Sequence, residues 1–162
     1  MAETAAPRPA DQVERGPAYD EDFFLWRQSQ AALLRAGQFD LVDWEHLAEE
    51  IESLGISDRR QLRNRLEVLL MQLLKWQFQP TRRSRSWRST IRTQRRRIER
   101  VLEESPSLRR EVAELSREEY AAARESASAE TGFALGTFPQ SLPYTPEQIL
   151  DNDFYPGPID EP

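Results

Sequence analysis

The length, composition and charge of the chain predict one globular domain and exclude several classes of protein. Its 162 residues, 38% hydrophobic and 31% charged, suffice to bury a core, and the absence of cysteine excludes disulfides, thiolate catalysis and cysteine-ligated zinc. No apolar run approaches the ~20 residues of a membrane span and the N-terminus lacks a hydrophobic signal core, so we expect a cytoplasmic protein that does not enter a membrane.

Capping and turn residues predict five main helices in chain order. The first residues are rich in alanine, proline and charge, so we expect a disordered lead-in over 1–18. Glycine or proline closes most of the helical segments that follow. The residues that can cap their starts are Asp20, Asp43, Ser57, Ser86 and Ser105. The predicted helices cover residues 20–36, 43–54, 57–79, 86–104 and 105–130.

A short helix and an extended segment complete the predicted domain. Thr145 and Gln148 match a capping box, which indicates a short C-terminal helix. The proline-punctuated segment over 133–145 is expected to lie across the bundle as a strap. No stretch alternates apolar and polar residues as a strand does. The fold class is therefore all-α, with one helical domain over 19–156 and a frayed tail over 157–162.

Apolar spacing predicts which helix faces are buried. The third predicted helix has a heptad-like seam from Leu62 to Trp76 with a second apolar stripe beside it. Such a helix lies at the centre of a bundle or meets a partner chain. The second predicted helix carries one apolar face, formed by Trp44, Leu47, Ile51 and Leu54. The residues predicted to be nearly fully buried are Trp44, Leu66, Leu69, Leu73, Trp76 and Ile91.

Several sequence motifs occur in a fixed order along residues 19–156. They are YDEDFFLW at 19–26, LAEEIESLG at 47–55, LLKWQFQP at 73–80, RSRSWRSTIRTQRR at 83–96, SPSL at 105–108, ETGF at 130–133 and FPQSLPYTPEQILDNDFYP at 138–156. Together they resemble a bacterial family catalogued as domain of unknown function twenty-nine. The resemblance implies a compact helical domain, and it implies no activity and no catalytic residue.

Charge is segregated along the chain. Residues 59–100 carry 14 basic and two acidic side chains, whereas the segments 19–58 and 101–162 are strongly acidic. The basic hairpin either pairs with the acidic helices within the fold or presents arginines to a ligand, which could be an acidic protein or nucleic acid. The net charge of −6 argues against nucleic acid. The candidate interaction surface is Arg82, Arg83, Arg85, Arg88, Arg92, Arg95 and Arg96.

Two further sets of polar residues are candidates for chemistry. His46, the only histidine, has the spacing to Glu49 and Glu50 of a weak metal site, although helical geometry points these side chains away from the core. Glu119 and Gln94 fall among apolar residues of their helices, so we expect both to be buried. A buried carboxylate needs a partner, and Glu119 is predicted to pair with an arginine of the fourth helix, Arg95 or Arg88.

Three functional hypotheses follow. We favour a non-enzymatic protein-interaction module with an unknown partner or a second copy of the chain, using the arginine-rich surface. The alternative is a nucleic-acid-associated regulator that uses the same arginines. A metal-dependent hydrolase is the further alternative, although no catalytic motif is found and no cofactor is predicted. An interaction module would expose an apolar patch of more than a few hundred Å².

Overall fold

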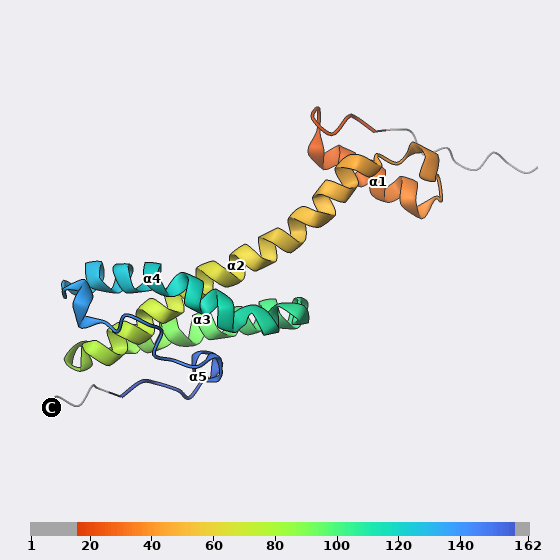
Figure 1. Cartoon of the computed structure of the whole chain (residues 1–162). Coiled ribbons are helices and arrows are strands. Elements are labelled where there is room, and N and C mark those ends of the chain that lie inside the picture. Colours follow the sequence, from red (N-terminus) through yellow and green to blue (C-terminus); the bar gives the residue numbers. More distant parts are fainter. Residues whose placement is uncertain (1–15, 158–162) are drawn as a thin grey trace, which may run out of the picture. The chain divides into compact units, whose positions relative to one another are not determined.

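The computed structural model describes residues 16–157, and within them the chain is helical and has no β-strand (Figure 1). The predicted all-α class is therefore confirmed. Most of the predicted lead-in over 1–18 and tail over 157–162 lies outside the described residues. None of the described helices combines the length and the apolarity needed to cross a membrane. The helices are α1 (Phe23–Arg35), α2 (Trp44–Phe78), α3 (Arg85–Glu104), α4 (Val112–Thr131) and α5 (Pro146–Leu150).

The chain divides into two compact units, and each is described by itself. Unit 1 is Met1–Leu54, described from Gly16, and holds α1 and the first part of α2. Unit 2 is Gly55–Pro162, described to Gly157, and holds the rest of α2 together with α3, α4 and α5. The single domain expected over 19–156 stays a prediction.

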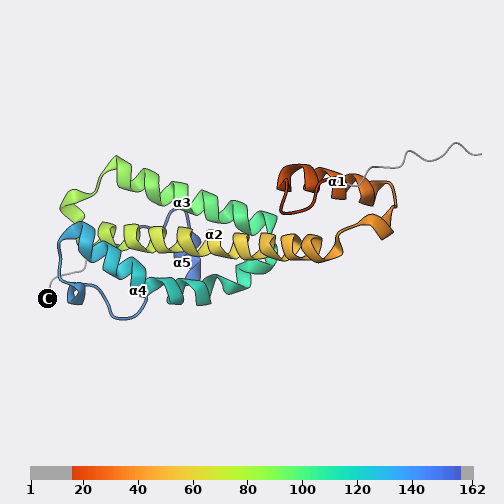
Figure 2. The same cartoon turned by 90° about the horizontal axis from the view of Figure 1, so that it is seen from above.

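The core of unit 2 surrounds the C-terminal part of α2. Figure 2 shows this part of α2 running between α3 and α4. Both of its apolar stripes are buried, which fits the prediction of a central helix. The predicted core residues that are buried here are Leu66, Leu69, Leu73, Trp76 and Ile91.

The predicted strap and short helix lie against this core. Phe138 and Tyr144 are buried in it, and the Tyr120 hydroxyl of α4 donates to the carbonyl of Pro139 at 2.8 Å. The predicted capping box is formed, since the Thr145 hydroxyl accepts from the backbone of Gln148 and the Gln148 side chain accepts in return. The strap thus closes unit 2 by burying aromatic side chains.

The second and third predicted helices are a single helix, which corrects the predicted count from five main helices to four within residues 16–157. A glycine stops a helix when it adopts a left-handed backbone, as Gly37 and Gly132 do with φ of 70° and 75°. Gly55 stays helical, and α2 continues through it. A helical glycine costs only about 1 kcal/mol relative to alanine, and the good helix formers on either side of it outweigh that cost.

The starts of three other helices also differ from the prediction. The helix expected from Ser105 opens as a 3-10 helix over Pro106–Glu111, and α4 begins only at Val112, without a side-chain cap. Asp22 rather than Asp20 caps α1, because its carboxylate accepts from the backbone of Leu25. Ser84 rather than Ser86 caps α3. For α1 and α3, another residue with a capping side chain lies two positions away, so local preference alone did not choose between them.

Unit 1 packs α1 against a face of α2 that was predicted to point outward. The buried side chains are few: Trp26, Gln30, Leu33 and Val42. Trp44, predicted to be in the core, is 55% exposed. The reason is that polar side chains of α2 occupy the interface with α1, which turns the apolar stripe of α2 away from it.

Candidate functional site

The arginine side chains of α3 follow from how this helix packs. The buried face of α3 is apolar and consists mainly of Ile91, Ile98, Val101 and Leu102. Residues three or four positions apart share a helix face, so burying this stripe turns the opposite side outward. Arg85, Arg88, Arg92 and Arg96 are exposed there.

These arginines line a surface groove of about 1270 Å³. One wall is α3 from Arg85 to Glu103, and the other is the segment after α5, represented by Asn152, Asp153 and Tyr155. The end near Arg85 is basic, whereas Glu99 and Glu103 line the far end. The groove therefore has a cationic part followed by a mixed part.

Three of the five cations of α2 are paired with glutamates of α4 or with the glutamate directly before it, and Arg60 and Arg65 have no ion pair within residues 16–157. Arg59 pairs with Glu111 at 2.8 Å, and Lys75 pairs with Glu130 at 2.5 Å. Arg63 of α2 pairs with Glu119 of α4. Pairing within the fold, one of the two sequence-based hypotheses for the basic hairpin, thus holds for three cations of its α2 side.

The basic end of the α3 groove has no such partners. Within residues 16–157, none of the arginines at this end of the groove or in the preceding turn is within ion-pair distance of a carboxylate. These residues are Arg82, Arg85, Arg88, Arg92, Arg96 and Arg97. The second hypothesis, that arginines are presented to a ligand, fits this side of the hairpin.

Arg88 is held in place by aromatic rings. Its guanidinium carbon lies 5.5 Å from the ring centroid of Trp76 and 5.5 Å from that of Tyr155. Arg83 lies over Trp76 as well, at 5.1 Å. A depression of about 370 Å³ opens beside these groups, lined by Trp76 and residues 83–85 and 88. A stacked guanidinium has already lost part of its freedom, so a ligand bound to it meets a smaller entropic cost.

Arg95 is not part of the surface, which corrects the prediction. It is 2% exposed, and it donates to the backbone carbonyls of Ile149 at 2.8 Å and Gln148 at 3.2 Å. Burial lowers the pKa of the Arg95 guanidinium, and the nearby Tyr155 and Asp151 oppose that shift. Its role is to satisfy the last carbonyls of α5 and so to fix the wall of the groove.

Arg83, which was also predicted to belong to the interaction surface, is only partly available there. It is half-buried and donates to the carbonyls of Trp76 at 2.8 Å and Pro156 at 3.4 Å. The predicted surface is thus reduced to five arginines, and the structure adds Arg97, which sequence reasoning missed. Arg97 directly follows Arg96, the last residue of the predicted surface, and this position could have indicated it.

The predicted ion pair of Glu119 exists, but its partner was wrong. Glu119 pairs with Arg63 of α2 rather than with Arg88 or Arg95 of α3, because this face of α4 lies against α2. The Arg63 side chain is 43% exposed, so water reaches the pair and its role is structural. Gln94 is half-buried, and its buried carbonyl oxygen has no hydrogen-bond partner among the described residues.

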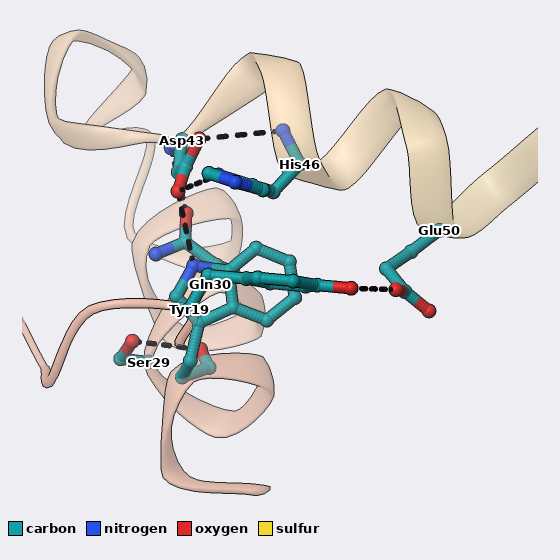
Figure 3. Close-up of polar contacts among 7 residues, drawn as sticks. Tyr19, Ser29, Gln30, Asp43, His46 and Glu50 are labelled. Carbon is teal, nitrogen blue, oxygen red and sulfur yellow. Dashed lines mark hydrogen bonds and ion pairs between the residues drawn. The ribbon is translucent and has the colours of Figure 1, made fainter. Parts of the chain in front are cut away.

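His46 lies at the interface of α1 and α2 instead of pointing away from it (Figure 3). Its ring stacks on Tyr19 with centroids 4.3 Å apart, and its Nδ1 lies 2.8 Å from the Asp43 carboxylate. The same carboxylate accepts from the Trp26 indole at 3.2 Å. The Tyr19 hydroxyl donates to Glu50 at 2.5 Å. Asp43, expected only as a helix cap, is the centre of this network.

The electrostatics of this network favour the charged forms of both His46 and Asp43. The hydrogen bond to Asp43 raises the pKa of His46. Burial raises the pKa of Asp43, but hydrogen bonds from His46 and Trp26 together outweigh it, and the pKa of Asp43 is lowered. Among the described residues, no three histidine, aspartate or glutamate side chains come together as a metal site. The weak candidates Glu49 and Glu50 do not join His46 in one.

The apolar stripe of α2 in unit 1 is exposed. Trp44, Ile51 and Leu54 have 55%, 62% and 66% of their surface open, and Leu47 is half-buried. Sequence periodicity identified the residues of this stripe correctly, but the prediction that the stripe faces the core was wrong.

Comparison with known proteins gives a family and no activity. Residues 18–155 match the model of the family described as Domain of unknown function DUF29. The match covers α1 to α5 and includes both the arginine groove and the His46 network. No curated protein matches the chain. No solved structure matches it either.

Proposed function

We propose that the chain, which belongs to the DUF29 family, is a protein-interaction module that binds an acidic segment of a partner protein in the α3 groove. The observation that carries this proposal is the contrast between two rows of cations. Three of the five on α2 (Arg59, Arg63 and Lys75) are paired with glutamates, whereas none at the basic end of the groove has an ion pair among the described residues.

The spacing of the groove arginines suits an acidic helix. Arg88, Arg92 and Arg96 are four positions apart, which places them about 6 Å apart along the axis of α3. Carboxylates at every fourth position of a partner helix have the same spacing. A guanidinium binds a carboxylate through two parallel hydrogen bonds, which gives direction as well as attraction.

A polypeptide suits the groove better than nucleic acid does. Glu99, Glu103 and Asp153 line part of it and would repel a continuous phosphate backbone. Stacking of bases needs open aromatic faces. The rings beside the groove, Trp76 and Tyr155, are already covered by Arg88.

Fluorescence anisotropy tests the proposal. The probes are a labelled helical peptide with glutamate at every fourth position and single- and double-stranded oligonucleotides of the same length. We expect the peptide to bind more tightly than either oligonucleotide at about 0.15 M salt. The triple variant Arg88→Gln, Arg92→Gln, Arg96→Gln should weaken peptide binding at least tenfold.

A second triple variant serves as the matched control. Arg60, Arg110 and Arg117 are exposed on other faces of unit 2, and replacing them by glutamine removes the same charge. We expect this variant to retain peptide binding to within about twofold, since the groove is intact. Equal losses in both triple variants would mean that only net charge matters. Tighter binding of oligonucleotides, lost in the groove variant, would replace the proposal with the nucleic-acid regulator.

A further inference from the structure

We propose a second docking surface on unit 1: the apolar stripe of α2 binds a partner helix that has an apolar seam flanked by basic residues. The stripe is Trp44, Leu47, Ile51 and Leu54. This surface is independent of the α3 groove, which lies in unit 2.

The spacing of the stripe is that of a helix-pairing seam. Its residues are three, four and three positions apart, which is the alternation of the core positions in a coiled coil. The seam extends over about three turns, or roughly 15 Å. Within the described residues Trp44, Ile51 and Leu54 remain more than half exposed, so this seam has no helix against it.

The exposure of the stripe results from satisfied polar contacts on another side of α2. Asp43, His46 and Glu50 bind α1 and the segment before it through Trp26 and Tyr19. These side chains lie roughly 60° to 120° around the helix from the stripe, at 100° per residue. Because the polar network holds α1, the apolar residues cannot also face it.

The exposed area is large for a surface helix. Three side chains of the stripe, Trp44, Ile51 and Leu54, are more than half exposed. Side chains of this size expose on the order of 100 Å² each at these fractions, so the three present roughly 300 Å². Patches of this size on soluble proteins mark interaction sites.

Charge selects a basic partner. At 100° per residue, Glu45 and Glu52 lie together on the Trp44 side of α2, roughly 120° to 140° from the centre of the stripe. Glu50 lies at the other edge of the stripe and also accepts from the Tyr19 hydroxyl. Residues 16–54 hold nine acidic and two basic side chains, a net charge of −7. A second copy of unit 1 would repel this surface, whereas lysine or arginine beside the partner's seam would attract it.

Titration calorimetry with designed helical peptides tests the proposal on the full chain. The probe is a three-heptad peptide with leucine at the core positions and lysine at the flanking ones. We expect it to bind, and a peptide with the same core and glutamate flanks to bind at least tenfold more weakly. Equal binding of the two peptides, or no binding of the lysine peptide, would overturn the proposal.

Variants locate the binding surface. Ile51→Gln with Leu54→Gln keeps good helix formers and should weaken the lysine peptide at least tenfold, with the helical circular dichroism unchanged. Glu52→Lys should weaken it severalfold, whereas Glu49→Lys, with the same charge change on the far side of α2, should not. The groove variant of Arg88, Arg92 and Arg96 should bind it normally. Self-association of the chain that Leu54→Gln abolishes would assign the stripe to a second copy instead.

Discussion

Arg95 and Arg96 follow one another on α3 and have opposite surroundings. Arg95 is buried and donates to two carbonyls of α5, whereas Arg96 is exposed at the groove. We expect Arg95→Gln to lower the free energy of unfolding by about 2–4 kcal/mol, because buried acceptors lose a charged donor. Arg96→Gln should change it by less than about 0.5 kcal/mol. Urea denaturation measures both, and similar costs would contradict the assignment.

At the scale of one helix, the two parts of α2 differ in burial. Leu69 is fully buried in unit 2, whereas Leu54 is 66% exposed in unit 1. We expect Leu69→Ala to cost about 2–5 kcal/mol, through lost transfer energy and a cavity. Leu54→Ala should cost less than about 0.5 kcal/mol. Denaturation of the two variants compares the same substitution at both sites. A cost above about 1 kcal/mol for Leu54→Ala would show that the stripe is covered.

Gly55 tests whether α2 is continuous. Its backbone is not in the positive-φ region, and a Cβ added to it would meet no atom within 4 Å. We therefore expect Gly55→Ala to stabilise the protein by about 0.5–1 kcal/mol, because alanine has the higher helix propensity. Thermal denaturation followed by circular dichroism measures the change. If Gly55 were instead a left-handed helix stop, as the sequence alone indicated, alanine would destabilise the protein.

At the scale of the molecule, the two units differ in how pH affects them. The pKa of His46 is raised, so the stability it adds is complete below its unfolded pKa of about 6.5 and is lost as pH rises through the folded pKa. The pKa of Asp43 is lowered, so its contribution is lost as pH falls through its own folded pKa. Unit 1 should therefore be most stable between about pH 4 and 6.5.

Hydrogen exchange resolved by residue measures this dependence. After correction for the intrinsic exchange rate, we expect the free energy of opening of the α1 amides to be lower at pH 8.5 than at pH 5.5. The core of unit 2 should show little of this change, because its packing involves no histidine. His46→Phe should keep the ring stacking on Tyr19 and abolish the difference in α1. A difference that persists in this variant would assign the pH effect to other groups.

The sequence by itself determined the helical class, most helix ends, the buried seam of α2 in unit 2 and the family. These features depend on local capping, on the absence of alternating patterns and on apolar periodicity, which are properties of neighbouring residues. The basic character of residues 59–100 was evident from the sequence as well.

Only the tertiary structure decided which cations are neutralised and which face of α2 is covered in unit 1. Helical periodicity fixes the angle between two stripes on a helix, but not which stripe a neighbouring helix covers. Tyr19 and Trp26 satisfy the polar side of α2, and that choice leaves Trp44 exposed. In the same way, Glu111 and Glu119 lie against Arg59 and Arg63 and not against Arg92, because ion pairs depend on which elements are adjacent in space.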